Sequence, residues 1–514
     1  MSGGNQTATA GRRRPKTASP RVHTSGVDSG FDIQYRALCS RDRRFDGRFY
    51  VGVTSTGVYC RPSCPAITPK RRNVRFYPTA AAAQNGGFRA CLRCQPHAAP
   101  GSPQWNQRGD LAARAIAMIA DGVVDRESVT GLARRLSYSE RHLHRQLMAE
   151  LGAGPIALAR AQRAQTARLL IETTSLRLID VAHAAGFSSV RQFNDTIKAT
   201  YERTPTELRR KAHPAPQSRG SASTLTVRLA YRDPIAWQEI LHHLAARAIP
   251  GVEEVTDMTY RRTLRLPHGH GVAEVTPVGD HIECRLRLED LRDLAAAVQR
   301  CRRLLDLDVD TNDVDEHLKR DPLLAPLVRK TPGLRVPGAV DGAELAVRAV
   351  LGQQISVAAA RTTAARLTSQ LGELIHDPDG TLTHLFPSAQ AIADADPETL
   401  PGPRRRRQTL QSLTRLLASQ EIVLDAGSDR DEVRSQLLEI PGIGSWTTDY
   451  IAMRALADPD AFLPTDLGAK RALAQLGRPT GATDIVDGAE TWRPWRAYAV
   501  QHLWANLGPR PSRQ

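Results

Sequence analysis

The chain has 514 residues, a length that predicts roughly three or four domains, each large enough to bury its own core. Hydrophobic residues make up 41% of it, and 37 glycines and 33 prolines are ordinary numbers, which excludes a collagen-like or wholly disordered chain. Lysine and arginine number 70 against 54 acidic residues, for a formal net charge of +16. A polyanionic partner is therefore expected, nucleic acid before an acidic membrane surface.

The sequence contains no sign of a membrane segment. No run of about 18 apolar residues occurs, and the first thirty residues contain arginines without the hydrophobic stretch of a secretory signal. We therefore expect a cytoplasmic, nucleoid-associated protein with no membrane partner. Because thiols stay reduced in that compartment, closely spaced cysteines indicate metal ligands or reactive groups before they indicate disulfides.

Segments rich in Gly, Pro, Ser and polar residues divide the chain into blocks. They lie at the amino-terminal end, at 95–109 and at 211–223. Residues 1–30 are expected to form a disordered basic tail. The blocks that we expect to fold span residues 31–97, 108–210, 224–305 and 320–507.

The first block contains five of the seven cysteines of the chain, and alternating runs such as RFYVGVTSTGVYC predict short strands around a small core. Cys60 and Cys64 are separated by three residues, and Cys91 and Cys94 by two. This is the ligand spacing of a tetrahedral zinc site made only of cysteines. The spacing alone is compatible with a purely structural zinc site. Cys39, outside this set, is expected to be a buried thiol.

The sequence around these cysteines resembles that of a known family. FDGRFYVGVTSTGVYCRPSCPA and NVRFYPTAAAAQNGGFRACLRCQPH are similar to the amino-terminal domain of bacterial Ada proteins, which repairs DNA methylphosphotriesters. The resemblance implies one zinc ion on the four cysteines, with Cys60 taking a methyl group from a backbone phosphate. It also implies that Thr56 and Arg93 contact phosphate, although both residue types are common on surfaces. The thioether product is not hydrolysed, so one transfer per molecule is expected.

Residues 108–210 contain one helical pattern twice. Each copy has an apolar helix, a small residue (Ser137 or Gly186), an aromatic residue and a polar helix led by serine, which predicts a helix-turn-helix. The tandem resembles the DNA-binding domain of the AraC family, and a helical bundle with solvated charges is the alternative. The recognition helices are predicted at about 139–149 and 188–199. Their candidate base-contacting side chains are Arg141, His144, Arg145, Arg191, Gln192 and Asn194.

The carboxy-terminal half begins with a small α+β unit. The β-rich runs LTVRLAY, RRTLRLP and HIECRLRL surround the helical segment PIAWQEILHHLAARAI within 224–305. The block 320–507 is predicted to be helical almost throughout. Within it, PGIG at 441–444 opens a helix, and the backbone N–H groups around Gly442 and Gly444 are expected to bind a phosphate.

The PGIG hairpin and an aspartate in PTDLG about twenty residues later together resemble the helix-hairpin-helix DNA glycosylases. Within that superfamily, residues 224–507 are similar to AlkA-type 3-methyladenine glycosylases. The resemblance implies that Asp466 is the catalytic carboxylate. It also implies a pocket for the damaged base lined by Trp446, Tyr450 and Trp504. The residues alone equally allow a helix N-cap at Asp466 and core positions for the aromatics.

The same resemblance implies three further features. Gln354, in LGQQIS, stands where AlkA-type proteins have an apolar wedge that fills the space left by a flipped base. Trp446 stands where bifunctional relatives have a lysine, so base release without strand cleavage is expected. No cysteine follows Cys301, so no iron–sulfur cluster is expected. The basic run at 403–407 is predicted to be a solvated helix face or a phosphate contact.

Together these patterns predict a multidomain α+β protein: a zinc-bound α/β module, an all-α tandem helix-turn-helix domain, a small α+β domain and an all-α glycosylase domain. The predicted function is alkylation repair fused to transcription activation, with a suicidal methyl acceptor and a monofunctional glycosylase of base excision repair. Double-stranded DNA, alkylated or promoter, and RNA polymerase are the expected partners. In the alternative, the glycosylase fold is inactive and serves as a DNA clamp in a transcription regulator.

Overall fold

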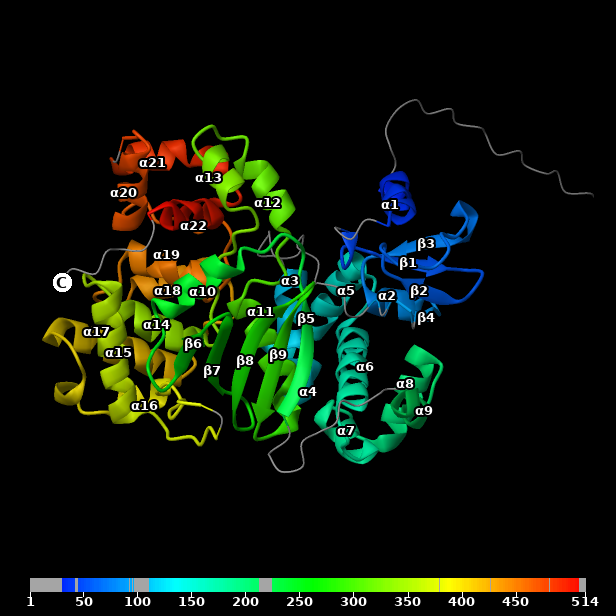
Figure 1. Ribbon diagram of the computed structural model, residues 1–514. Coiled ribbons are helices and arrows are strands. Elements are labelled where there is room, and N and C mark those ends of the chain that lie inside the picture. The colour runs from blue at the N-terminus through cyan, green and yellow to red at the C-terminus, as the bar shows by residue number, and fades with distance from the viewer. Residues whose placement is uncertain are drawn as a thin grey trace, which may run out of the picture.

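The computed structural model describes residues 30–41, 45–91, 93–94, 96, 111–211, 224–378, 380–425, 427–479 and 481–507. The predicted tail therefore lies outside the described residues, apart from Gly30, which begins a helix. Four parts follow one another along the chain, from the blue amino-terminal part to the yellow and red helices in Figure 1. Every helix in the described ranges is too short or too polar to cross a lipid bilayer.

The amino-terminal part is a four-stranded sheet in the order β3-β1-β2-β4 with two helices beside it. Its elements are α1 (Gly30–Cys39), β1 (Tyr50–Val53), β2 (Val58–Cys60), β3 (Val74–Tyr77), α2 (Ala80–Asn85) and β4 (Arg89–Ala90). The alternating run forms the β1–β2 hairpin, in which Val51 pairs with Cys60. Cys39 was predicted to be buried, and this is wrong. It is exposed because it ends α1, whose buried residues are Ala37 and Leu38.

The second part contains the predicted helical repeat. Its helices are α3 (Leu111–Ala120), α4 (Val123–Arg135), α5 (Glu140–Leu151), α6 (Pro155–Thr173), α7 (Leu178–Ala184), α8 (Val190–Tyr201) and α9 (Pro205–Lys211). Ser139 caps α5 as expected, but α8 is capped by Ser189 and begins two residues later than predicted. Ser137 and Gly186 both have left-handed backbones. One residue separates Ser137 from the cap Ser139, whereas two residues separate Gly186 from the cap Ser189.

The third part is a five-stranded antiparallel sheet in the order β5-β9-β8-β7-β6, shown in green in Figure 1. Its elements are β5 (Thr224–Ala230), α10 (Trp237–Ala245), β6 (Glu253–Thr256), β7 (Thr259–Arg265), β8 (His270–Val278), β9 (His281–Leu288) and α11 (Leu294–Leu304). The three β-rich runs of the sequence form β5, β7 and β9. The sequence did not predict β6, which is short and acidic, or β8, which contains Gly271 and Pro277.

The last part is helical. Its helices are α12 (Thr311–Leu318), α13 (Ala325–Lys330), α14 (Gly342–Leu351), α15 (Val357–Leu371), α16 (Ala389–Asp394), α17 (Arg404–Ala418), α18 (Arg430–Leu438), α19 (Ser445–Arg454), α20 (Leu467–Gln475), α21 (Ala482–Gly488) and α22 (Arg496–Asn506). Its apolar core includes Val347 on α14, Ile451 on α19 and Val500 on α22, each at most 1% exposed. This core fixes the relative positions of α19, α20 and α22, which carry the predicted glycosylase site.

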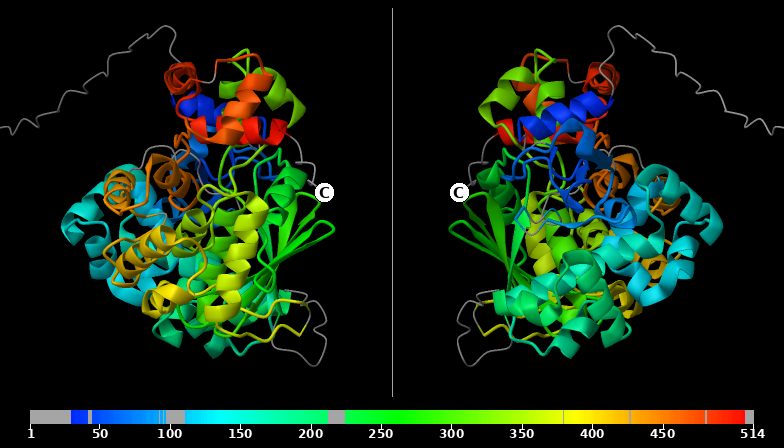
Figure 2. Two further views of the ribbon diagram at one scale, coloured as in Figure 1. Left: turned by 90° about the vertical axis from the view of Figure 1, so that its left-hand side faces the viewer. Right: turned by 90° about the vertical axis from the view of Figure 1, so that its right-hand side faces the viewer.

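The four parts pack against one another, as Figures 1 and 2 show. Arg48 of the first part donates to Asp310 of the last at 2.7 Å. Thr79, before α2, donates to the carbonyl oxygen of Leu151 at the end of α5 at 3.1 Å. Arg114 on α3 forms an ion pair of 3.2 Å with Asp429, the N-cap of α18. The parts are therefore joined by side-chain contacts as well as by the chain.

Asp306, in the turn after α11, gives the fold a pH-dependent element. Its carboxylate accepts hydrogen bonds from the Tyr498 hydroxyl at 2.8 Å and the Val336 N–H at 3.2 Å. Burial raises the pKa of Asp306 to about 7, against about 4 in an unfolded chain. Between about pH 4 and about pH 7, the Asp306 carboxyl group is therefore protonated in the folded chain and ionised in the unfolded chain. The stability linked to this proton is complete below about pH 4 and is lost as the pH rises through about 7.

Replacing Asp306 with Asn is expected to remove this dependence. Between pH 5 and pH 8 the melting temperature of the native chain should fall more than that of Asp306→Asn, because only the native chain has this proton to lose. Thermal unfolding followed by tryptophan fluorescence measures both. The exposed Asp396→Asn is the control and should follow the native chain. Parallel curves for Asp306→Asn and the native chain would contradict the raised pKa.

Candidate functional site

The four predicted zinc cysteines are brought together. The sulfur atoms of Cys60, Cys64, Cys91 and Cys94 all lie within 4.8 Å of one another. Four sulfurs around a zinc ion at about 2.3 Å lie roughly 3.8 Å apart in a tetrahedron, so the cluster fits this ion with little adjustment. Three of the cysteines are buried and Cys91 is half-buried. An all-sulfur donor set of this spacing favours zinc among the common metals of proteins.

A buried carboxylate holds the loop that carries two of these cysteines. Asp46, 4% exposed, accepts hydrogen bonds from the backbone N–H of Ser63 at 3.0 Å and from its hydroxyl at 2.5 Å. The N–H of Cys64 donates to the Arg61 carbonyl and closes the turn between the cysteines. The sequence analysis missed Asp46, because it lies 17 residues from Ser63 and no local pattern links them.

The two predicted phosphate contacts of this part lie on its surface. Thr56 is exposed in the turn between β1 and β2, and its hydroxyl donates weakly to the Val53 carbonyl at 3.4 Å. Arg93 is exposed between Cys91 and Cys94. Both side chains are therefore accessible to solvent.

The predicted base-contacting residues lie on α5 and α8, the two predicted recognition helices. Five of the six side chains are exposed: Arg141, His144, Arg145, Arg191 and Asn194. Gln192 is half-buried and accepts a hydrogen bond from the Ser188 hydroxyl at 3.1 Å. The two helices differ in the turn that precedes each of them. Tyr138 is 43% exposed and stacks on His142 with ring centroids 4.9 Å apart, whereas Phe187 is 3% exposed and belongs to the core.

Asp466 is both a helix cap and the centre of a hydrogen-bonded group. It is the N-cap of α20, and its Oδ1 accepts the backbone N–H of Ala469 at 2.7 Å. The same oxygen accepts the indole N–H of Trp504 at 2.8 Å, and Oδ2 accepts that of Trp446 at 3.1 Å. Three donors from α19, α20 and α22 therefore fix this half-buried carboxylate. Capping and a chemical role for Asp466 do not exclude each other here.

The aromatic group continues along α19. The Tyr450 ring stacks on Trp446 with centroids 5.3 Å apart and planes at 7°. Its hydroxyl accepts a hydrogen bond from Arg454 at 2.8 Å. Burial alone raises the pKa of Tyr450, but the guanidinium groups of Arg454, Arg247 and Arg348 outweigh burial and lower it. The sequence analysis missed Arg454, which the four-residue spacing from Tyr450 on one helix could have indicated.

The predicted hairpin joins α18 to α19. Gly442 and Gly444 are both exposed, and Gly444 is the N-cap of α19. Gly442 has φ 93°, and a Cβ atom there would lie 2.1 Å from the Thr409 hydroxyl, so only glycine fits. Gln354 is exposed and has a left-handed backbone with φ 58°.

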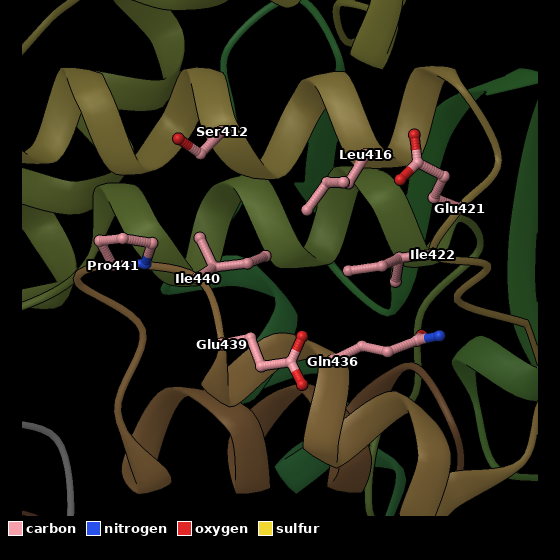
Figure 3. Close-up of a pocket in the computed structure, with 8 residues that line it drawn as sticks. All are labelled: Ser412, Leu416, Glu421, Ile422, Gln436, Glu439, Ile440 and Pro441. Carbon is pink, nitrogen blue, oxygen red and sulfur yellow. The ribbon is translucent and has the colours of Figure 1, made fainter.

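A pocket of about 360 Å³ lies between α17 and the segment that ends in the hairpin (Figure 3). Its lining residues are Ser412, Leu416, Glu421, Ile422, Gln436, Glu439, Ile440 and Pro441. Neither Asp466 nor any of the three aromatics beside it lines this pocket. It is therefore separate from the predicted base site.

Comparisons with known proteins cover most of the chain. Four family models match successive segments: the metal binding domain of Ada over 33–97, a helix-turn-helix domain over 132–211, the AlkA N-terminal domain over 226–341 and the HhH-GPD superfamily of base excision DNA repair proteins over 347–496. A Mycobacterium tuberculosis H37Rv protein described as a probable bifunctional transcriptional activator/DNA repair enzyme AlkA is 55% identical over 478 residues. This match covers 93% of the chain and 96% of that protein.

The chain belongs to this AlkA-type activator and repair family. Two Escherichia coli K12 proteins match its separate parts. DNA-3-methyladenine glycosylase 2 is 35% identical over 55% of this AlkA-type chain and 98% of its own length. The bifunctional transcriptional activator/DNA repair enzyme Ada is 30% identical over 39% of the chain. This match spans about half, 52%, of the length of Ada. The predicted fold class, a zinc module followed by helix-turn-helix, α+β and glycosylase parts, is confirmed.

Proposed function

We propose that the chain is a cytoplasmic DNA alkylation-repair protein and transcription activator that removes methyl damage by two separate reactions. One reaction hydrolyses the N-glycosidic bond of alkylated bases of the 3-methyladenine type. The other transfers a methyl group from a DNA methylphosphotriester to Cys60, once per molecule. The observation that carries the proposal is the Asp466 carboxylate, held by two indole N–H groups beside a stack of aromatic rings.

In the glycosylase reaction, the flipped base rests against the rings of Trp446, Tyr450 and Trp504. Alkylation makes the purine cationic, and electron-rich ring faces attract it. As the bond from sugar to base breaks, its electron pair leaves with the base, and positive charge develops on the sugar. The Asp466 carboxylate stabilises that charge and accepts a proton from the attacking water. With Trp446 in place of a lysine, the base is released without strand cleavage.

The surface around this site supplies the DNA contacts. We propose that the backbone N–H groups at Gly442 and Gly444 bind a phosphate, since the amino end of α19 favours an anion. Gln354 fills the space that the flipped base leaves. A purified chain that releases 3-methyladenine from DNA treated with dimethyl sulfate would support the reaction. A chain that binds this DNA and releases no base would support the alternative, an inactive glycosylase fold that acts as a clamp.

In the methyl transfer, the Cys60 sulfur attacks the methyl carbon of the phosphotriester. A sulfur–carbon bond forms as the carbon–oxygen bond breaks, and the electron pair leaves with oxygen as a phosphodiester anion. Zinc bound by Cys60, Cys64, Cys91 and Cys94 would keep the sulfur as a thiolate at neutral pH. Thr56 and Arg93 orient the phosphate. The thioether is stable, so Cys60 is not regenerated.

We propose that the two recognition helices bind promoter DNA in successive stretches of major groove, with RNA polymerase as a further partner. The side chains that we assign to this contact are Arg141, His144, Arg145, Arg191, Gln192 and Asn194. Repair and regulation would be linked through charge. Four thiolates on one zinc ion carry a net charge of about −2, and conversion of one to a thioether leaves about −1.

Methylation of Cys60 is therefore expected to raise the affinity of the chain for duplex DNA, because the sulfur cluster then repels the phosphates less. Filter binding to promoter DNA, before and after reaction with methylphosphotriester DNA, measures the change. The increase should shrink at higher salt concentration, since salt screens the repulsion. Equal affinities of the methylated and unmethylated chains at low salt would contradict the charge switch.

A further inference from the structure

The loop that carries Gln354 is tied to the hairpin by one side chain. Gln353 donates from Nε2 to the Gly442 carbonyl oxygen at 3.0 Å and to the Thr447 hydroxyl at 3.1 Å. Gln353 and Gln354 are adjacent, yet Gln353 points to the hairpin while Gln354 is exposed in a left-handed conformation. A residue other than glycine keeps such a conformation only where its surroundings hold it.

Helix α17 joins the same two segments from a second direction. Arg406 donates from its guanidinium to the carbonyl oxygen of Gln353. One turn further along, the Thr409 hydroxyl donates to the Pro441 carbonyl oxygen at 2.8 Å, and Gly442 allows the close approach. Figure 3 shows α17 running alongside Ile440 and Pro441. The loop, the helix and the hairpin thus form a closed triangle of hydrogen bonds.

This triangle gives separate roles to the arginines of the basic run. Arg404 and Arg405 are exposed at the start of α17. Arg406 and Arg407 are half-buried and are used inside the protein: Arg406 holds the loop, and Arg407 forms an ion pair with Glu398 at 2.8 Å. The prediction of a solvated helix face therefore applies to the first two arginines and not to the second two.

We propose that Gln353, Arg406 and Thr409 are positioning residues that fix Gln354 relative to the hairpin. Hairpin binding to the phosphate backbone and entry of Gln354 into the base stack then occur as one rigid movement. This inference rests on the proposed glycosylase function. It predicts a specific dependence on substrate, because a base in a duplex must be unstacked and replaced, whereas a base in a single strand is already free.

Gln353→Met tests the proposal, since methionine keeps the length of the side chain and removes both hydrogen bonds. The measurement is the single-turnover release of 3-methyladenine from dimethyl sulfate-treated duplex DNA and from the same DNA after denaturation. The ratio of the duplex rate to the single-strand rate is expected to fall about tenfold, as the loss of two hydrogen bonds implies. Gln354→Ala should lower the same ratio, because it removes the side chain being positioned.

The matched control is Gln390→Met. Gln390 also donates from Nε2, to Asp394 on an exposed face of α16 at 2.8 Å and 2.9 Å, and its loss should leave the ratio unchanged. If Gln353→Met does not fold, as judged by its melting curve, Thr409→Val breaks the same triangle at constant volume. An unchanged ratio in a folded variant, with Gln354→Ala reduced, overturns the proposal.

A second readout does not require base release. 2-Aminopurine placed next to a stable abasic-site analogue becomes fluorescent when binding unstacks it. The native chain should raise this fluorescence, and Gln353→Met should raise it less at saturating protein. If the native chain releases no base from either DNA, the proposed function fails, and this fluorescence alone decides the positioning role. Equal fluorescence with the native chain and with Gln353→Met then overturns it.

Discussion

Asp466→Asn is expected to lower the release of 3-methyladenine from methylated DNA by at least about a hundredfold. Asparagine caps helices about as well as aspartate, so the bond from the Ala469 N–H can persist and α20 can form. A neutral amide cannot stabilise positive charge on the sugar or accept a proton from water. The variant therefore separates the cap from the chemistry at one position. Single-turnover release, followed by chromatography of the free base, measures the effect.

The control for this variant is another capping aspartate of the same part. Asp341 caps α14 and accepts the Glu344 N–H at 3.0 Å, in the same way that Asp466 caps α20. Asp341→Asn should release the base at the native rate, and the melting temperatures of the two variants should be similar. If Asp466→Asn retains the native rate, Asp466 is only a cap. If the native chain also releases nothing while binding DNA, the clamp alternative stands.

The second large effect concerns the sulfur cluster. Incubation with DNA containing methylphosphotriesters is expected to add one methyl group per native chain, on Cys60, and none to Cys60→Ala. The reason is that a metal-bound thiolate is nucleophilic at neutral pH, and we assign the attack to Cys60 among the four zinc-binding cysteines. Mass spectrometry of the intact chain and of its peptides gives the number of methyl groups and their position.

The chain contains its own control for this experiment. Cys39 is exposed at the end of α1 and does not belong to the sulfur cluster, so it tests whether any accessible thiol accepts the methyl group. Cys39→Ala should take up one methyl group as the native chain does. A methyl group on Cys39, or uptake by Cys60→Ala, would contradict the assignment of Cys60.

The sequence predicted those parts of the sites that short motifs encode. The spacing of Cys60, Cys64, Cys91 and Cys94 is local, and so is the hairpin around Gly442. Hydrogen bonds between side chains that are distant in sequence could not be predicted: the resemblance to AlkA-type glycosylases implied that Asp466, Trp446 and Trp504 belong to one site, but no pattern indicated that both indoles donate to the carboxylate. The indoles that bind Asp466 come from positions 20 and 38 residues away on two other helices. Asp46 and Ser63 are similarly remote from each other in sequence, and only the folded loop brings them together.

The same distinction between local patterns and distant contacts applies to the fold. Strands with alternating apolar residues were predicted. Strand β8 was not predicted, because Gly271 and Pro277 have poor strand propensities. It forms because its pairing with β7 and β9 outweighs these propensities. Cys39 was placed wrongly because a general preference of thiols for burial says nothing about which face of α1 packs. The start of α8 was placed two residues early because Ser188 and Ser189 are equally good caps by composition.

The unequal turns of the helical repeat determine how the chain can read DNA. One residue more separates Gly186 from the cap of α8 than separates Ser137 from the cap of α5, and the aromatic residue that follows is buried only in the second copy. The two reading helices therefore begin after turns that differ in length and in burial. A palindrome presents the same bases to both helices, whereas their exposed side chains differ, with Arg141 and His144 on α5 and Arg191 and Asn194 on α8. We expect natural operators of this protein to consist of two unlike half-sites.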